Sequence, residues 1–492
     1  MSVICIDIGT TRCKISTIRS DGQVLSECAF PHNAQLPRNK LDSELIFHAI
    51  DLELQRLFSQ FNCIEAITAS SFGETFICTD QRGTALAPGI LYFDTRAKPQ
   101  VEKLNSLLGE QTVYSHTGHR LHTVSPLAKL CWTKEHEAEL IDDSFCFLFM
   151  ADYILVRLGA SPFMSKSFAV ASNWMDYCAR EQWSDALAAA EIPVQKLPSV
   201  QSAGTIVGHL SPTLCERYHC STPPKLIAGG HDQPFATIGA GAYSPGDAVY
   251  GMGTSDSLNL ILPEPMLTEC AYQYGFYCEQ YFDTPNYLTS AQLPSGGKSL
   301  TWAEQLLFSS SKDFSFEICK SHIGQAVTRK NDILFFPLIN GSGTPFSLTP
   351  LSGSFWGLTA QATPYDLLLS VLEGVAFEMK FNLELLHRCN MDCRHIIASG
   401  GGAQFDDWLQ LRSDILGLPL WISGSKNTGV SGLFALCAVT LGYFDTLQEA
   451  VQSTNPVCGV KNPCFSESDY YTKKYQQYRE LRTFIQNRSL KN

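Results

Sequence analysis

The segment Val3–Ile18 consists of two β-rich runs joined by Gly9-Thr10-Thr11-Arg12, and it limits the possible folds more than any other stretch. Neither run has the periodicity of a helix, so the pattern predicts a hairpin. A hairpin excludes the Rossmann and Walker loops, because those loops turn directly into a helix. The turn can point backbone N–H and Oγ groups at phosphate oxygens, with Lys14 adding a charge and Asp7 able to hold a hydrated Mg²⁺. The same residues also suit an ordinary surface hairpin, since Thr and Gly favour turns.

A second unit of this kind, strand, Gly-Thr turn and strand, spans Ala248–Leu258, with Gly253 and Thr254 at its turn. It begins roughly 240 residues after the first, which indicates a duplicated architecture with one phosphate loop from each domain facing a shared cleft. A chain of 492 residues is long enough for two domains. We therefore predict an α/β protein with an N-terminal domain over residues 1–243 and a C-terminal domain over residues 244–492.

The segment Ile227–Gln233 has an apolar lead-in, then Gly229 and Gly230, and then Asp232. Small apolar residues at helical spacing follow from Pro234. The pattern predicts a strand that runs into a tight turn and presents Asp232 at a cleft, where the carboxylate can accept a proton from a hydroxyl. The alternative is that Asp232 only caps the following helix.

Two further breaks at strand ends carry polar or glycine residues. Glu65–Ile77 contains a polar break at residues 70–74, and Glu74 and Asp94 offer groups that could bind ligand hydroxyls or could be solvated loop charges. Ile396–Trp408 reads as a strand, three glycines and the start of a helix. Backbone amides there could accept a nucleotide, with the glycines allowing close approach.

The composition of the chain argues against some classes of binding partner. Hydrophobic residues make up 45% and charged residues 17%, and the net charge is −12 without basic clusters, which argues against nucleic acid or an anionic membrane. No charged and apolar leader opens the sequence and no apolar run reaches membrane-spanning length, so we expect a cytoplasmic protein that binds a small molecule. The 18 cysteines lack the spacing of zinc sites, and we expect small buried thiols.

Assembled in order, these stretches resemble the FGGY family of carbohydrate kinases over essentially the whole chain, most nearly its xylulokinase-like members. Gly353-x-Phe-x-Gly-Leu358, seven residues and then Asp366-Leu-x-x-Ser-Val-Leu-Glu373 fit the C-terminal signature at every defined position. The other landmarks match in the right order, at Asp7–Thr11, Gly230–Gln233, Gly253-Thr254 and Gly400–Ala403.

The resemblance implies an actin- and hexokinase-like fold, in which two ribonuclease-H-like domains close on ATP with Mg²⁺ and on a sugar or polyol. It implies Asp232 as general base and Asp7 as the carboxylate associated with Mg²⁺. The implied contacts to ATP are Thr10, Thr11, Lys14, Gly253, Thr254, Gly297, Thr301, Gly401, Gly402 and Asp406. The implied contacts to the substrate are Phe72, Glu74, Asp94, Asp232 and Gln233.

The sequence departs from the family pattern mainly on the sugar side. Ser71-Phe-Gly-Glu74 replaces the Gln-Met-His-Gly of xylulokinases, Val124 and Thr133 interrupt the first signature around Lys129-Leu-x-Trp132, and Asn427 stands where many members carry Glu. We expect ATP-dependent phosphorylation of a ketopentose such as xylulose or ribulose, or of a related ketose or polyol. The alternatives are an actin-like ATP-binding scaffold and an ATP or phosphate hydrolase. The sequence allows a homodimer and does not fix the oligomeric state.

Overall fold

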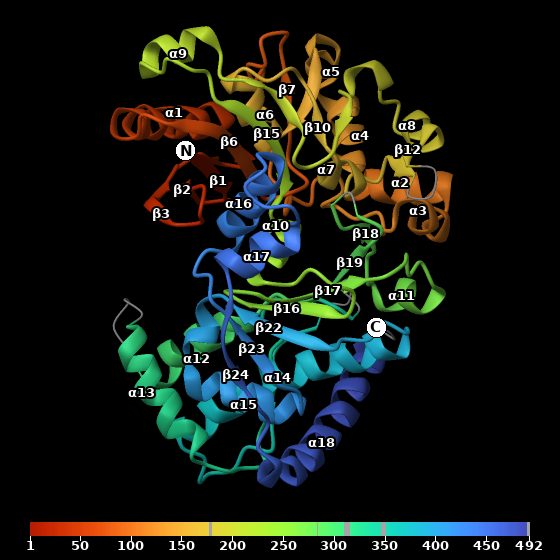
Figure 1. Cartoon of the computed structure of the whole chain (residues 1–492). Coiled ribbons are helices and arrows are strands. Elements are labelled where there is room, and N and C mark those ends of the chain that lie inside the picture. The colour runs from red at the N-terminus through yellow and green to blue at the C-terminus, as the bar shows by residue number, and fades with distance from the viewer. Residues whose placement is uncertain (177–179, 283, 309–314, 346–350, 490–492) are drawn as a thin grey trace. The chain divides into compact units, whose positions relative to one another are not determined.

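The computed structural model describes residues 1–176, 180–282, 284–308, 315–345 and 351–489. The chain folds into two compact units (Figure 1). Unit 1 comprises Met1–Gly239, Cys278–Leu288 and Asn427–Pro456, and unit 2 comprises Ala240–Tyr277, Thr289–Lys426 and Val457–Asn492. None of the helices among the described residues combines the length and the apolar character that crossing a membrane requires. The predicted division of roles between residues 1–243 and 244–492 stays a prediction.

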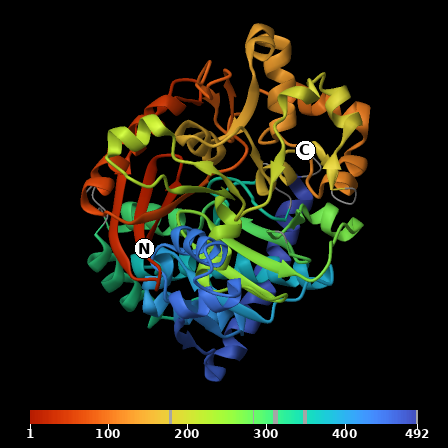
Figure 2. The same cartoon turned by 45° about the horizontal axis from the view of Figure 1, so that its top comes forward.

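Unit 1 is built on a six-stranded sheet with the order β14-β15-β6-β1-β2-β3. Its strands are β1 (Ser2–Ile8), β2 (Arg12–Arg19), β3 (Val24–Pro31), β6 (Ile64–Ser71), β14 (Ile206–His209) and β15 (Lys225–His231). The first three lie next to one another as red strands in Figure 2. β1 is antiparallel to β2, which confirms the predicted hairpin, and it is parallel to β6, which in turn is parallel to β15.

The alternation of side chains along β1 explains why this strand lies at the centre of the sheet. Ile4, Ile6 and Ile8 belong to a large apolar core together with residues of α1 (Ser43–Gln60). Val3 and Cys5 point to the opposite face and pack with apolar residues of α16 (Thr428–Thr440). Since both faces are covered, every residue of β1 except Asp7 is buried.

Residues 98–160 are mainly helical, with one short strand among the helices. Its elements are α2 (Lys98–Leu108), α3 (Glu110–Thr117), α4 (Pro126–His136), α5 (Ala138–Asp143), β9 (Cys146–Phe149) and α6 (Met150–Leu158). β9 pairs with β7 (Phe76–Thr79), the strand that follows the predicted polar break. The break therefore lies between two strands, and the second of these belongs to a different sheet from β6.

Unit 2 repeats the topology of unit 1. Its seven-stranded sheet has the order β18-β19-β17-β16-β22-β23-β24. The strands are β16 (Asp247–Met252), β17 (Asp256–Leu262), β18 (Glu279–Gln280), β19 (Tyr287–Leu293), β22 (His395–Ser399), β23 (Leu420–Ser423) and β24 (Val457–Lys461). Across the sheet of unit 2, the antiparallel hairpin β16–β17 lies next to the parallel strands β22 and β23, and antiparallel β24 forms the edge. Across the sheet of unit 1, the hairpin β1–β2 lies next to β6, β15 and β14 in the same way. The predicted duplication is confirmed.

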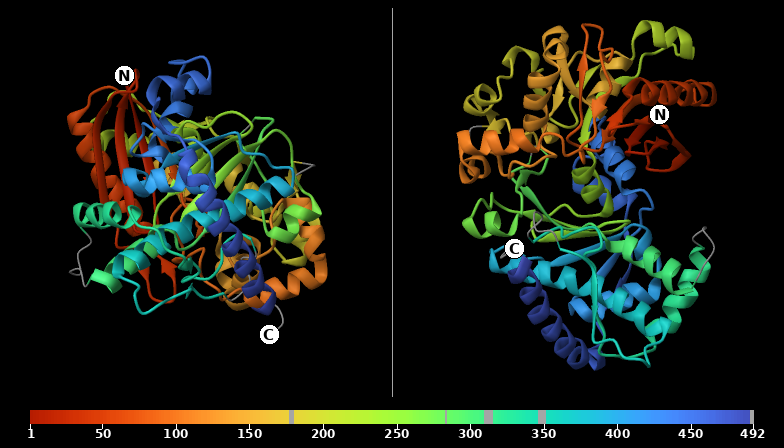
Figure 3. Two further views of the ribbon diagram at one scale, coloured as in Figure 1. Left: turned by 90° about the horizontal axis from the view of Figure 1, so that it is seen from below. Right: turned by 180° about the vertical axis from the view of Figure 1, so that it is seen from behind.

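Helices complete unit 2. They include α12 (Gly296–Phe308), α13 (Phe316–Val327), α14 (Pro364–Arg388), α15 (Asp406–Leu416) and α18 (Phe465–Ser489). A reciprocal cap starts α14, because Thr363 accepts from the backbone of Asp366 while the Asp366 carboxylate accepts from the backbone of Thr363. α18 packs on α14 and α15 (Figure 3).

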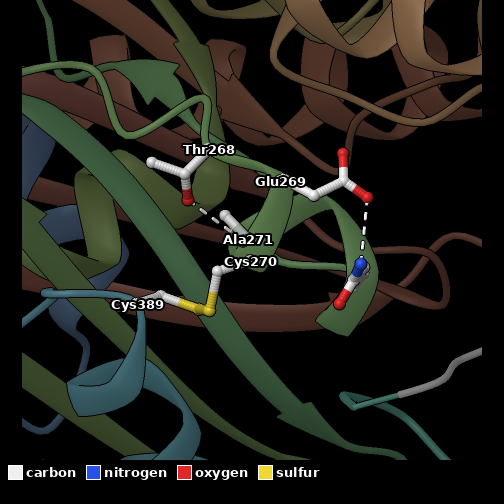
Figure 4. Close-up of a disulfide and its surroundings, with 6 residues drawn as sticks. Thr268, Glu269, Cys270, Ala271 and Cys389 are labelled. Atoms are coloured by element: carbon white, nitrogen blue, oxygen red, sulfur yellow. Dashed lines mark hydrogen bonds between the residues drawn. A yellow bond between two sulfur atoms is a disulfide. The ribbon is translucent and has the colours of Figure 1, made fainter.

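The expectation of buried thiols is wrong for one pair of cysteines. Cys270 in α11 (Glu269–Tyr274) and Cys389 after α14 form a disulfide, with a Cα–Cα distance of 5.5 Å (Figure 4). The pair is 119 residues apart in sequence, so spacing could not reveal it. Among the described residues, the free cysteines Cys63, Cys458 and Cys464 are also exposed rather than buried.

Candidate active site

The carboxyl ends of β1, β6 and β15 carry Asp232, the predicted general base, and Asp7, the carboxylate predicted to associate with Mg²⁺. Asp7 lies opposite Ser70 in the register of β1 and β6, and the Ser70 hydroxyl donates to Asp7 Oδ1 at 3.2 Å. Gly230 pairs with Ser70 from the other side at a φ of 143°, a conformation that favours glycine. β15 then turns into α10 (Asp232–Ala240), which confirms the predicted strand and helix around Asp232.

Asp7 and Asp232 perturb each other electrostatically. Burial and the charge of Asp232 raise the pKa of Asp7 to about 6, although Lys14 and the Ser70 hydroxyl act in the opposite direction. Lys14 Nζ lies 3.9 Å from Asp7 Oδ2. Burial and the charge of Glu74 also raise the pKa of Asp232, with His231 opposing the shift. Two carboxylates under mutual repulsion favour the binding of a cation or the uptake of a proton.

Glu74 occupies the turn between β6 and β7 with a φ of 58°, a backbone conformation that side chains rarely adopt and that often marks a functional site. Its charge acts on two buried neighbours. Burial and the charges of Glu74 and Asp232 raise the pKa of Tyr92. Burial lowers the pKa of His231, but the charges of Asp232, Glu74 and Glu279 outweigh this effect, so the pKa is raised.

The side chains that flank Asp232 in sequence turn back toward it. His231 Nε2 lies 3.4 Å from Asp232 Oδ1, and Gln233 Nε2 donates to the same oxygen at 3.3 Å. A Cβ on Gly73 would come within 2.9 Å of His231 Nε2, so glycine is needed there. His231 lies inside the motif that carries Asp232, and only its chain neighbourhood could have pointed to it.

Sequence reasoning did not assign a role to Lys129, which is fully buried in α4. Its Nζ donates to the carbonyl oxygens of Leu91 at 3.1 Å and Tyr92 at 2.8 Å. Burial lowers the pKa of Lys129 to about 7, although Glu74 and Asp94 raise it in part. The lysine thus fixes the loop that carries Tyr92. The available signal was one lysine among the apolar residues of this helix.

Two predicted substrate contacts, Phe72 and Asp94, are buried near this loop. The ring centroid of Phe72 lies 6.4 Å from that of Tyr92. Asp94 pairs with Arg96, Nε to Oδ1 at 2.8 Å, and accepts from Asn39 Nδ2 at 3.0 Å. Burial opposes the shift, yet these donors lower the pKa of Asp94. Both carboxylate oxygens of Asp94 therefore already have donors.

The tip of the β1–β2 hairpin carries Thr10 and Thr11, and Thr11 is exposed. Gly9 N donates to the Arg12 carbonyl at 2.9 Å and closes the turn. Gln35 Nε2 donates to the Thr10 carbonyl at 3.0 Å, so the segment after β3 supports the tip.

In unit 2, the exposed tip of the β16–β17 hairpin packs against the start of α12. Gly297 N and Lys298 N donate to the carbonyls of Gly253 and Thr254, each at 2.9 Å. A Cβ on Gly297 would lie 2.3 Å from the Gly253 carbonyl oxygen, so only glycine permits this approach. The positive end of the α12 dipole thus lies against the hairpin tip, where it favours a negatively charged ligand such as phosphate.

The three consecutive glycines Gly400–Gly402 also pack near the β16–β17 hairpin. Gly400 and Gly402 pack against Met252, and a Cβ on Gly402 would lie 2.8 Å from the Met252 Cβ. Gly401 faces open space. Two other predicted nucleotide contacts have protein partners, since the Thr301 hydroxyl donates to the Gly297 carbonyl at 3.2 Å and Asp406 pairs with Lys461 at 2.7 Å.

The donor set of unit 1 fits magnesium. Among the described residues, no group of three or more His, Cys, Asp or Glu side chains could enclose a metal ion. Mg²⁺ does not need such a cage, because it keeps several waters and binds through one or two carboxylates plus phosphate oxygens. Asp7, held by Ser70 and repelled by Asp232, suits that role.

Comparison with known proteins agrees with this arrangement. Models of the N-terminal and C-terminal domains of the FGGY family of carbohydrate kinases match residues 2–239 and 248–441. Xylulose kinase of Staphylococcus xylosus is 25% identical over 91% of this chain and 92% of its own length, and gluconokinase of Bacillus subtilis is 25% identical over 91% and 90%. The crystal structure of xylulose kinase from Rhodospirillum rubrum superposes with a TM-score of 0.90 at 19% identity, covering 99% of this chain and 100% of that one.

The fold is therefore the two-domain α/β fold of actin and hexokinase, with ribonuclease-H-like sheets, as predicted. The family matches include both hairpins described above and leave out β24 of the second sheet. The chain belongs to the FGGY family of carbohydrate kinases.

Proposed function

We propose that this kinase transfers the γ-phosphoryl group of ATP to a hydroxyl of a small neutral ketose or polyol, with a ketopentose such as xylulose or ribulose as the first candidate. The observation that carries the proposal is Asp232, a carboxylate at a strand end with a raised pKa beside Glu74. Xylulose kinases among the relatives support the choice of sugar.

Asp232 accepts the proton of the attacking hydroxyl, a step worth about 10²–10⁴ in rate. Phosphoryl transfer otherwise depends on positioning and charge neutralisation. Gln233 orients the Asp232 carboxylate through its hydrogen bond to Oδ1. Glu74 accepts hydrogen bonds from sugar hydroxyls, and Phe72 and Asp94 shape the loop region around Tyr92.

Magnesium, when bound, neutralises charge on the phosphate oxygens, and Asp7 would hold it. Thr10, Thr11 and Lys14 are the proposed phosphate contacts of unit 1. Gly253 and Thr254 are those of unit 2, and the other proposed nucleotide contacts there are Gly297, Thr301, Gly401, Gly402 and Asp406. Thr301 and Asp406 would have to exchange their present protein partners for the nucleotide.

The charges near Asp232 favour a neutral substrate. Three carboxylates, of Asp232, Glu74 and Glu279, act on the imidazole of His231. The side-chain nitrogen of Lys129 donates to two backbone carbonyls. An anionic aldonate such as gluconate would meet like charge here, whereas hydroxyls can donate to these acceptors.

A coupled assay of ADP release with a panel of ketoses, aldoses, polyols and gluconate tests the proposal. We expect turnover that depends on a neutral ketose or polyol and is lost in Asp232→Asn. ATP hydrolysis at the same rate without any sugar would identify a hydrolase, and ATP binding without turnover would identify a scaffold. Turnover with gluconate alone would overturn the argument from charge.

A further inference from the structure

A fully buried charged cluster lies at the base of the β16–β17 hairpin. Arg412 of α15, Asp256 of β17 and Tyr250 of β16 are each at most 1% exposed. Arg412 Nη1 donates to Asp256 Oδ2 at 2.5 Å and also to the Tyr250 hydroxyl, which in turn donates to Asp256 Oδ2 at 2.9 Å. The guanidinium carbon lies 4.0 Å from the ring centroid of Trp408 and 4.9 Å from that of Tyr250. Arg412 therefore neutralises Asp256.

Stability alone gives a weak reason for this cluster. Removing an ion pair from water costs several kcal/mol per ion, so a buried pair often contributes no more than apolar residues of the same volume. Asp256 Oδ1 and Arg412 Nε and Nη2 have no hydrogen-bond partner within the described part of the chain. The arrangement is incompletely satisfied and yet fully enclosed.

The position of Asp256 gives a better reason. It begins β17, two residues after Thr254, and pairs with Met252 across the hairpin. A Cβ on Gly296 would lie 2.0 Å from Asp256 Oδ1, so the start of α12 rests directly on this carboxylate. The next two residues of α12 are those that donate to the hairpin tip. A movement of Asp256 would thus displace both the hairpin and the helix N-terminus.

We propose that Arg412 is a positioning residue for nucleotide binding: through Asp256 and Tyr250 it fixes the hairpin tip at Gly253-Thr254 against the N-terminus of α12. The inference rests on the proposed function, which assigns the tip to the phosphates of ATP. Arg412 also cancels the charge of Asp256, which would otherwise repel those phosphates.

The chain supplies a matched control in the same unit. Arg482 of α18, Glu378 of α14 and Tyr478 of α18 form a second cluster of the same three groups, also at most 1% exposed. Arg482 donates to Glu378 through Nε at 3.0 Å and Nη2 at 2.9 Å, and the Tyr478 hydroxyl donates to the same carboxylate. This cluster joins α14 to α18 rather than to the hairpin.

The test compares Tyr250→Phe and Arg412→Met with Tyr478→Phe and Arg482→Met. Calorimetric titration with Mg-ATP in the absence of sugar gives Kd, steady-state kinetics gives the KM for sugar, and thermal unfolding gives Tm. We expect the first pair to raise Kd for ATP roughly tenfold or more while the sugar KM stays within about twofold, and the second pair to lower Tm with Kd within about twofold of the wild type.

Two results would overturn the inference. One is an ATP Kd in Tyr250→Phe and in Asp256→Asn that equals that of the wild type, and these milder changes decide the matter if Arg412→Met does not fold. The other is an equal rise of Kd in both pairs, which would show a general loss of stability. Wild-type protein that binds no ATP would overturn the proposed function as well, so the two failures are distinguishable.

Discussion

Replacing Lys129 by methionine should change how the stability of the protein depends on pH. Lys129 is fully buried, and burial lowers its pKa from 10.5 to about 7. Between these values the unfolded chain binds the proton and the folded chain does not. Stability therefore rises with pH through this window, and the full penalty is present below a pH of about 7.

The magnitude follows from the shift. The gap between 10.5 and about 7, at about 1.4 kcal/mol per pH unit, amounts to about 5 kcal/mol. Methionine removes this penalty and leaves the Tyr92 carbonyl without its Lys129 donor, at a cost of about 1–3 kcal/mol, whereas the Leu91 carbonyl still accepts from the Asp94 N–H at 3.0 Å. Below neutral pH the variant should therefore be more stable than the wild type by a few kcal/mol. Above it, this advantage should shrink, and at a pH of about 10 the variant should be slightly less stable than the wild type.

Urea unfolding of both proteins in parallel, from a pH of about 6 to about 10, measures this difference. We expect the variant to be more stable by a constant few kcal/mol below a pH of about 7, and we expect this difference in free energy of unfolding to disappear progressively above it. Lys98→Met, at an exposed lysine of α2, serves as the control and should give a difference that hardly depends on pH. A constant difference for Lys129→Met over the whole range would refute a neutral buried amine.

Three further predictions concern the proposed site. Asp232→Asn should lower kcat by about 10²–10⁴ and leave the binding of ATP and sugar largely intact, and wild-type kcat in the purified variant would remove Asp232 from the role of base. Glu74→Gln should raise the sugar KM roughly tenfold, since one acceptor becomes a donor, while the KM for ATP hardly changes; the opposite result in steady-state kinetics would move Glu74 out of the sugar site. Asp7→Asn should abolish the additional rise in Tm that Mg²⁺ produces over ADP alone, and a rise equal to that of the wild type would contradict magnesium binding at Asp7.

The parts that could be predicted from the sequence are those in which a few consecutive residues set the structure. Glycine turns between β-rich runs predicted both hairpins. Gly229 and Gly230 before an apolar helical pattern predicted the strand and helix around Asp232. The same turns, found twice, gave the duplicated topology. These signals are local: Gly230 has a φ of 143°, a conformation that few other residue types adopt, and a Cβ on Gly229 would lie 1.9 Å from the Ala69 carbonyl oxygen.

The parts that could not be predicted depend on contacts between distant residues. Lys129 donates hydrogen bonds to carbonyls 38 and 37 residues earlier in the chain, and Arg412 donates to Asp256 across a separation of 156 residues. The periodicity of the sequence does not predict such a contact, because a lysine or arginine is expected at the surface unless its buried partner is known. The disulfide between Cys270 and Cys389 was missed for the same reason.

The two hairpins share a topology, but the carboxylate beside each turn has different surroundings. This difference matches the roles we propose for the two units. Asp7 in unit 1 remains partly exposed, and burial of the carboxyl together with the repulsion of a second acid, Asp232, raises its pKa. Asp256 in unit 2 is enclosed, and a buried guanidinium neutralises it. A carboxylate left under repulsion gains from a metal ion, whereas a neutralised one leaves the amides of its hairpin free to attract phosphate. Duplication thus supplied two equivalent turns, and the different partners of the acidic residue beside each turn match the proposed binding of metal in one unit and of nucleotide in the other.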